Sequence, residues 1–384
     1  MCLPFRNGGP TEGDDYMATF ASSSTYSGVY VVFMVNRLQI LFTILILPMY
    51  LVHSYMIWGI IAIGILSQLN LLILSKWFSS DFAAKGYNGF VELFGERTVR
   101  LFVIAGLFPI LLNIVVNTLG YVQMVHTFIF PSMDNKWLIL SIFLVGCYVA
   151  AKGMANTIRF VMIAFLSGAW IILLFLPLFF PPEASLYDLY PLVPTDWSIG
   201  PWKSWLALWS SFSGPEYLIC LTTWLSPQQK IRKYLTLANA ITVFEYVYLF
   251  VASLLFFGPH YLNAINFPVV HMGRYLQSPV IERIDTILLS IHMFNYVFAI
   301  AILLLCFYGA VRIILGRLHK QTTRTGYVSA CLVILICMFI VDKWFWNATA
   351  RENFWVTLQM WLGAFTYSLI PVFLLLAIKR KGAV

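Results

Sequence analysis

The sequence predicts an all-α, polytopic membrane protein with ten transmembrane helices. Of its 384 residues, 60% are hydrophobic and only 10% are charged, and the mean hydropathy is +0.82; these values are typical of chains that cross a bilayer repeatedly. Apolar runs of about 20 residues, the length of one helical crossing, alternate with charged connectors. One of these runs, 202–227, is interrupted at its centre by Ser213-Gly214-Pro215-Glu216.

This interruption predicts two half-helices that meet near the membrane midplane. Pro215 lacks the N–H that a continuing helix needs, and Gly214 lets the backbone leave helical geometry at little cost. Ser213 and Glu216 have the spacing of a capping box, which marks a new helix start. Broken backbone at this depth is tolerated only beside protein or a watery cavity, and in transporters such breaks bind small ligands.

The N-terminal segment 1–33 differs in composition, with Gly, Ser, Thr and acidic residues early in it. We expect a disordered or misassigned extension, with Met17 or Met34 as alternative starts. Arg37 then opens an uncharged run, 38–74, which is long enough for two crossings. Pro48 and the polar residues after it suggest where to divide this run.

The remaining apolar runs complete the predicted ten-helix domain, 34–384. The expected helices are about 38–54, 56–75, 101–129, 137–151, 157–180, the broken 202–227, 235–257, 286–310, 326–342 and 355–378. The connector 258–284 is expected to hold a short surface helix, because Val269, Met272 and Leu276 share a helical face.

The distribution of basic residues predicts that both termini are cytoplasmic. With this orientation 18 Lys and Arg residues, Arg37 among them, fall on the cytoplasmic side and 6 on the other, as the positive-inside rule requires. The net charge of +8 therefore needs no nucleic-acid partner to explain it.

Two irregular helices at corresponding places predict an inverted repeat of five plus five helices. Pro48 lies in the first helix and Gly214-Pro215 in the sixth. Repeat one would span about 38–180 and repeat two about 201–378. The pattern is that of a secondary-transporter-like fold.

The predicted ligand site combines both irregular helices with polar residues that could line the same cavity. Free N–H groups after Gly214 would receive a carboxylate such as that of an amino acid, although no side chain requires that ligand rather than a sugar. The alternative for the polar residues is ordinary hydrogen bonding between membrane helices. The predicted site residues are Thr43, Pro48, Asn113, Asn117, Ser213, Gly214, Pro215, Glu216, His292 and Asn295.

Glu216 and Glu245 are the two acidic residues inside the predicted spans, and acids in such positions are functional candidates. Glu216 has two interpretations, a structural cap for the new half-helix or a contact to ligand or proton. Glu245 is expected to be a protonated interhelical hydrogen-bonder, with a proton relay as the alternative. No nucleophile–base pair, phosphate loop or metal-ligand cluster is found in the sequence, so we expect no enzyme, catalytic residue, cofactor, metal or disulfide.

Four stretches of the chain resemble the endospore germination permeases, the GerAB-like B subunits of spore nutrient receptors. They are Lys152-Gly153 with Arg159, Leu189-Tyr190-Pro191-Leu192 followed by Phe212 to Glu216, the basic turn Lys230 to Lys233, and Phe267-Pro268 through Glu282-Arg283-Ile284-Asp285. The family's first helix usually carries glycines, which are missing here after Gln39, and His292 replaces its usual tryptophan.

The resemblance implies a LeuT-type fold within the amino acid/polyamine/organocation superfamily. It further implies a nutrient sensor in the inner membrane of the spore, with its termini on the core side, that works with an A-type subunit and a lipoprotein C-type subunit. Two alternatives remain: a proton- or ion-coupled amino acid permease, and a structural partner whose cavity is vestigial. A substitution such as Gly214→Val, which should block the break, distinguishes the last of these.

Overall fold

In the computed structural model, helices are the only regular secondary structure among the described residues, and one isolated β-bridge joins Tyr26 to Leu225. The described residues are 26–182, 184–193, 202–225, 231–276, 283–318, 320–346 and 353–381.

Seven helices in this part of the chain are long and apolar enough to cross a membrane, which confirms a multi-pass membrane protein. The bent pair α1 (Gly28–Ile40) and α2 (Thr43–Leu51) makes an eighth crossing when it is counted as one span, and α7 (Asn135–Ala151) is a shorter apolar helix. The seven are α3 (Met56–Phe78), α6 (Glu96–Phe128), α8 (Met154–Ala169) with α9 (Ile171–Leu174), α11 (Ile231–Leu262), α13 (Ile284–Ile314), α14 (Arg324–Trp344) and α15 (Phe354–Arg380).

Short helices lie in the connectors between the long ones. They are α4 (Asp81–Ala84), α5 (Tyr87–Phe94), η1 (Leu176–Phe179), η2 (Leu186–Leu189) and α12 (Pro268–Tyr275). Helix α12 confirms a short helix in the connector 258–284, and it buries Val269 and Met272 as one face, while Leu276 follows its last residue.

Helix α1 begins ten residues before the predicted start at residue 38, so the boundary of the N-terminal extension at residue 33 was wrong. Residues 28–33 are helical, and Val31 and Met34 are fully buried; the segment 1–25 lies outside the described residues. The predicted position of the first irregularity was also wrong. The axis bends by 49° between α1 and α2, whereas Pro48 lies inside α2 and its carbonyl accepts the N–H of Val52 at 3.2 Å.

The bend falls at 41–42 because side chains satisfy the carbonyl that it frees. The Gln39 carbonyl accepts the Thr43 hydroxyl at 3.1 Å and the Tyr246 hydroxyl at 2.8 Å. Since an unpaired carbonyl in the hydrocarbon region costs several kcal/mol, a helix can open only where such partners exist.

A second interruption separates α10 (Trp202–Ser211) from η3 (Pro215–Trp224). Gly214 adopts φ +128°, a conformation that favours glycine. The half after the break is a 3₁₀ helix rather than the expected α-helix, and Pro215 stands at its first position, where the missing N–H leaves no bond unmade.

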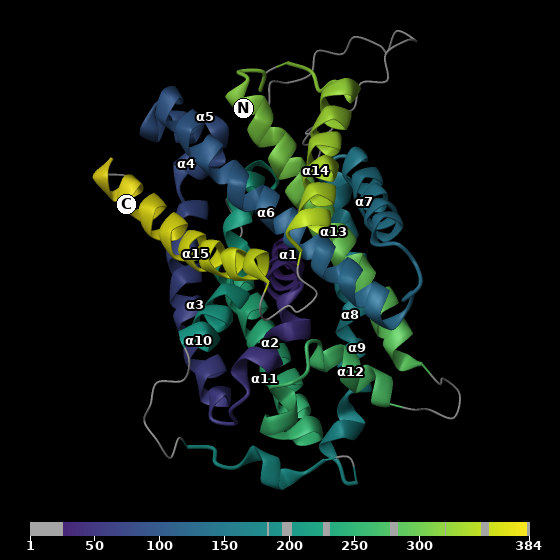
Figure 1. The fold of residues 1–384 in the computed structure, drawn as a ribbon. Helices are drawn as coiled ribbons and strands as arrows, with labels where there is room; N and C mark the ends of the chain where they lie inside the picture. The colour runs from purple at the N-terminus through teal and green to yellow at the C-terminus, as the bar shows by residue number, and fades with distance from the viewer. Residues whose placement is uncertain are drawn as a thin grey trace.

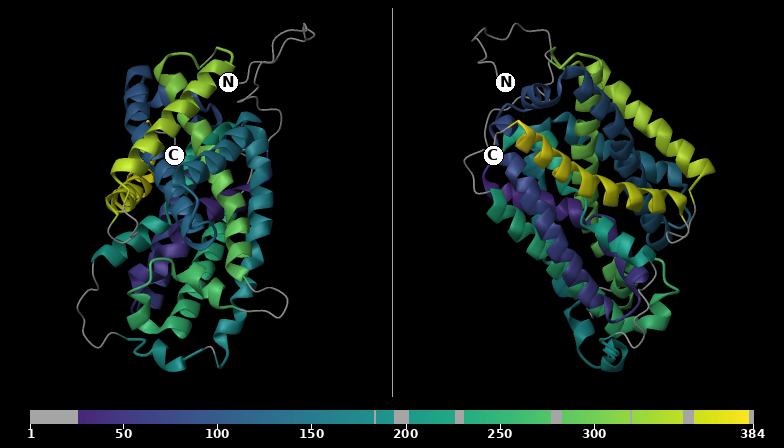
Figure 2. Two further views of the ribbon diagram at one scale, coloured as in Figure 1. Left: turned by 45° about the vertical axis from the view of Figure 1, so that its right-hand side comes forward. Right: turned by 90° about the vertical axis from the view of Figure 1, so that its left-hand side faces the viewer.

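Helix α13 is the most deeply buried of the long helices and packs against α6, α7 and α8. Helix α1 lies against α11 and α8, which brings the first bend into the centre of the bundle (Figure 1). The short α4 and α5 lie with the C-terminal end of α15 at one end of the molecule, and α12 lies at the other (Figures 1 and 2).

Candidate ligand site at the helix breaks

A cavity of about 40 Å³ lies between the two helix breaks. Its walls come from α1, α2, α6, α10, η3, α13 and α15, and its apolar side includes Leu38, Phe42 and Leu303. The polar side chains that line it are Gln39, Thr43, Asn113, Asn117, Ser210, Ser213, Tyr217 and Gln359. A space of this size holds only a few water molecules.

Asn113 is the centre of the polar wall. Its Nδ2 donates to the Tyr217 hydroxyl at 2.8 Å. Its Oδ1 accepts from Asn117 Nδ2 at 2.6 Å and from Gln359 Nε2 at 2.8 Å. The side chain thereby joins α6 to η3 and α15, so a movement of any of the three changes the shape of the cavity.

Gln39 connects the first break directly to the second. Its Nε2 donates to the Phe212 carbonyl at 3.1 Å, and its Oε1 accepts the Thr242 hydroxyl of α11 at 2.8 Å. The Tyr246 hydroxyl, also on α11, lies 2.8 Å from the Gln39 carbonyl and 2.9 Å from the Ser211 carbonyl. The Tyr246 hydroxyl has one proton, so it donates to one of these two carbonyls at a time, and Thr43 of α2 also donates to the Gln39 carbonyl, at 3.1 Å. Side chains of α1, α2 and α11 therefore supply donors to the carbonyls at both breaks.

Gly214 brings the second break against the backbone of α1. A Cβ atom at this position would lie 2.9 Å from Leu38 Cβ and 3.0 Å from the Leu38 carbonyl oxygen. Real Cβ atoms almost never approach so closely, so the contact between the two breaks requires glycine.

Glu216 caps the half-helix that it starts. Its Oε2 accepts the Gly214 N–H at 2.7 Å, and its Oε1 accepts the Thr366 hydroxyl of α15 at 3.3 Å. The carboxylate thus reaches back to the start of η3, but to the N–H of Gly214, the N-cap residue, and not to that of Ser213, as the capping-box spacing predicted. The Ser213 N–H bonds to the Ser210 carbonyl instead. Glu216 is buried and does not line the cavity.

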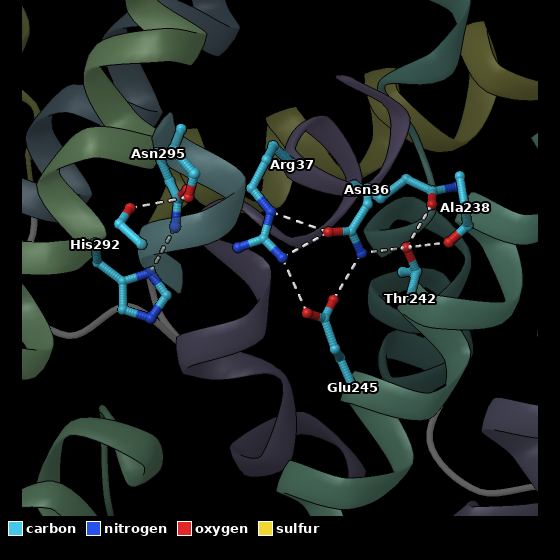
Figure 3. Close-up of polar contacts among 10 residues, drawn as sticks. Asn36, Arg37, Ala238, Thr242, Glu245, His292 and Asn295 are labelled. Atoms are coloured by element: carbon cyan, nitrogen blue, oxygen red, sulfur yellow. Dashed lines mark hydrogen bonds and ion pairs between the residues drawn. The ribbon is translucent and has the colours of Figure 1, made fainter. Parts of the chain in front are cut away.

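A buried ion pair involves Arg37, which directly precedes the wall residues Leu38 and Gln39 (Figure 3). Arg37 Nη2 lies 2.9 Å from Glu245 Oε1, with side chains that are 1% and 4% exposed. Asn36 Nδ2 donates to Glu245 Oε2 at 2.6 Å, and Asn36 Oδ1 accepts from Arg37 Nε at 2.9 Å. Both oxygens of Glu245 accept hydrogen bonds, one from Arg37 and one from Asn36. Glu245 therefore joins α11 to α1, as expected of an interhelical hydrogen-bonder, and its ion pair with Arg37 was not predicted.

The other side of the Arg37 guanidinium faces α8 and α13. It lies 5.0 Å from the centre of the Phe165 ring, and a Cβ at Gly168 would be 2.6 Å from Arg37 Nη1. Arg37 is therefore inside the bundle, not at the cytoplasmic boundary where the count of basic residues placed it. Moving this one residue leaves 17 basic residues against 6, so the expected orientation is unchanged.

The predicted site residues fall into three groups. Thr43, Asn113, Asn117, Ser213 and Gly214 line the cavity together. Pro215 and Glu216 follow Gly214 in the chain but are not in the wall, and Pro48 lies farther along α2. Of these ten residues, the wall contains five, and the ligand-binding role of all ten stays a prediction.

His292 and Asn295 form the third group and do not line the cavity. They are buried on α13, where Asn295 Nδ2 lies 3.3 Å from His292 Nδ1. Figure 3 shows Arg37 between this pair and Glu245. Their contact lies within α13, so among the described residues the two are neither in the cavity wall nor joined by it to another helix.

Sequence reasoning did not include Gln39, Ser210, Tyr217 and Gln359 in the site. Tyr217 could have been included from the sequence, because it directly follows the predicted break and the capping residue Glu216. Gln359 gave a weaker signal, because it is a single amide in the apolar run of α15, and isolated polar residues in a span face the bundle interior or a cavity.

Three comparisons relate the chain to known proteins. A family model described as "Spore germination protein" matches residues 24–345, a range that includes both breaks and the ion pair. Spore germination protein GerQB of Bacillus cereus is 26% identical over 255 residues, which is 66% of this chain and 66% of that protein, just under two thirds of its length. The crystal structure of MhsT in complex with L-phenylalanine has a TM-score of 0.45 and 13% sequence identity, over 95% of this chain and 100% of that one.

Proposed function

Because the chain belongs to the spore germination protein family, we propose that it is the nutrient-sensing membrane subunit of a spore germination receptor. The observation that carries this proposal is the cavity between two helix breaks, lined by eight polar side chains. Polar groups in the interior of a membrane protein are expensive, so such a concentration indicates a ligand site. The name of the GerQB relative agrees with a role in germination.

The proposed fold has ten spans in two inverted five-helix repeats of the LeuT type. The eight crossings counted above, together with α7 and the α10–η3 pair, give this number. The bend of α1–α2 and the break of α10–η3 then fall in the first and the sixth span, as an inverted repeat requires. The excess of basic residues puts both termini on the core side of the spore inner membrane.

Sensing would follow from a shift of population between two arrangements of the broken helices. The cavity holds only a few waters, so a nutrient must bind an arrangement in which the breaks lie farther apart. A ligand that binds this arrangement better increases its population. The change would then reach A-type and C-type receptor subunits, which we propose as partners.

A coupled amino acid permease is the second candidate, because the same cavity would serve it and Glu216 is a buried carboxylate at the break. Glu245 is less suited to proton coupling, since Arg37 already neutralises it. Uptake of labelled solute into vesicles that contain the chain, compared with vesicles that contain the Gly214→Val variant, separates transport from sensing.

We expect spores that lack this gene to lose their response to one class of nutrient. The loss of optical density during germination would be followed across a panel of amino acids, sugars and nucleosides, in a strain without other germination receptors. Restoring the gene should restore the response. A full response to every nutrient in the deletion strain would contradict the sensor function.

A further inference from the structure

Among the residues that the structure describes, the cavity wall contains no charged side chain, although it is polar. It presents four amides, of Gln39, Asn113, Asn117 and Gln359, and four hydroxyls, of Thr43, Ser210, Ser213 and Tyr217. A charged ligand group in such a site would exchange its hydration for neutral dipoles only. Burial of a charge without an opposite charge or several strong hydrogen bonds is unfavourable.

A ligand carboxylate was expected to bind the free N–H groups after Gly214, and the chain already uses donors at this break. Gly214 donates to Glu216 Oε2 at 2.7 Å, and Pro215 has no N–H to offer. The N–H of Tyr217, two residues after Pro215, donates to the Gly214 carbonyl at 3.0 Å. The protein thus supplies its own carboxyl group at the start of η3, at the place where a ligand carboxylate was expected to bind.

The wall nevertheless has unused hydrogen-bonding capacity among the described residues. The Tyr217 hydroxyl accepts from Asn113 and keeps its proton free to donate. Asn117 and Gln359 each use their NH₂ group toward Asn113 and keep their side-chain oxygen free to accept. A ligand hydroxyl can both donate and accept, so it complements this mixture of neutral donors and acceptors.

We propose that the cavity selects an uncharged solute rich in hydroxyl groups, such as a sugar or a nucleoside, over a zwitterionic amino acid. This inference rests on the proposed function, of which it names the ligand class. It replaces the amino acid that the break alone suggested. Apolar contacts from Leu38, Phe42 and Leu303 would face the carbon skeleton of such a ligand.

Binding to the purified full-length chain in lipid nanodiscs tests this selectivity by calorimetry. The neutral probes are D-glucose, D-fructose, uridine and adenosine, which also separate sugars from nucleosides. The zwitterionic probes are L-alanine, L-serine and L-asparagine, of which the last two carry a hydroxyl or an amide beside the charged head group. At least one neutral probe is expected to bind, and no zwitterionic probe is expected to bind at the same concentrations.

The Asn113→Leu variant identifies the cavity as the place of binding. It removes the amide that joins Tyr217, Asn117 and Gln359, so binding is expected to weaken about tenfold or more, as for a loss of more than one neutral hydrogen bond. Asn156→Leu is the matched control, because Asn156 is exposed at the start of α8. The hydrogen bond that its side chain makes among the described residues is to the carbonyl of Lys152, which lies just before this helix.

Binding of L-alanine, L-serine or L-asparagine that Asn113→Leu weakens would overturn the inference and leave the sensor function intact. Binding of none of the seven probes would also overturn it. In that case the germination panel decides separately whether the sensor function fails as well.

Discussion

Substitution of Gly214 by valine is expected to abolish the nutrient response while the protein remains in the membrane. At φ +128° a β-branched residue is strained, by about 1–3 kcal/mol. Its Cβ would also lie 2.9 Å from Leu38 Cβ and 3.0 Å from the Leu38 backbone, which would push the two breaks apart and fill part of the cavity wall. Germination rate at saturating nutrient, divided by the abundance of the protein on immunoblots, measures the effect.

Gly106→Val is the matched control for this substitution. Gly106 lies within α6, and a Cβ there would meet no atom within 4 Å, so the response per molecule should stay close to that of the wild type. A wild-type response from Gly214→Val at normal abundance would show that the break is not used and would favour a vestigial cavity.

Substitution of Arg37 by methionine is expected to cause the largest loss of stability of any single change proposed here. It leaves Glu245 charged, buried and without its cation, and removing one partner of a buried pair typically costs about 3–5 kcal/mol. The midpoint and slope of denaturant unfolding in detergent micelles measure this loss.

The double variant Arg37→Met, Glu245→Leu is expected to recover most of that stability, because no unpaired charge remains and the apolar side chains fill similar space. The two losses should therefore be strongly non-additive. Additive losses would contradict the geometry of the pair. If the double variant is stable but no longer responds to nutrient, the pair serves the movement of α1 against α11 rather than folding.

The second break was predictable because the interactions that make it are local. Glu216 bonds to the Gly214 N–H, two residues away, so its capping role is a local feature, although the spacing of Ser213 and Glu216 indicated the Ser213 N–H as the partner. The presence of a cap does not depend on the rest of the fold. The sequence could not show whether a donor at the break would bind the Glu216 side chain or a ligand carboxylate, because both groups accept hydrogen bonds in the same way.

The first break was placed wrongly because distant residues decide its position. Pro48 is the only helix-breaking residue in 38–54, but a helix tolerates proline where its neighbours satisfy the freed groups. The backbone opens instead beside Tyr246, whose hydroxyl meets the Gln39 carbonyl from 207 residues away. No local pattern contains this contact.

Arg37 was misplaced for a related reason. A single charge before an apolar run is normally a boundary, because charges inside a bilayer are expensive. Its partner Glu245 is 208 residues away, and each residue taken alone has a simpler interpretation. Only their juxtaposition across α1 and α11 shows why both are tolerated.

The central claim, that the nutrient binds in the cavity between the breaks, is tested most directly by the dose–response of spores that carry Tyr217→Phe. This change removes one hydroxyl from the cavity wall and keeps the ring. Tyr148→Phe, at an exposed position on α7, is the control.

The nutrient concentration for half-maximal germination should rise about three- to tenfold in Tyr217→Phe, as for the loss of one neutral hydrogen bond, with an unchanged maximal rate. The control should match the wild type. An unchanged half-maximal concentration in Tyr217→Phe, at normal abundance and for every nutrient that depends on this gene, would contradict the claim.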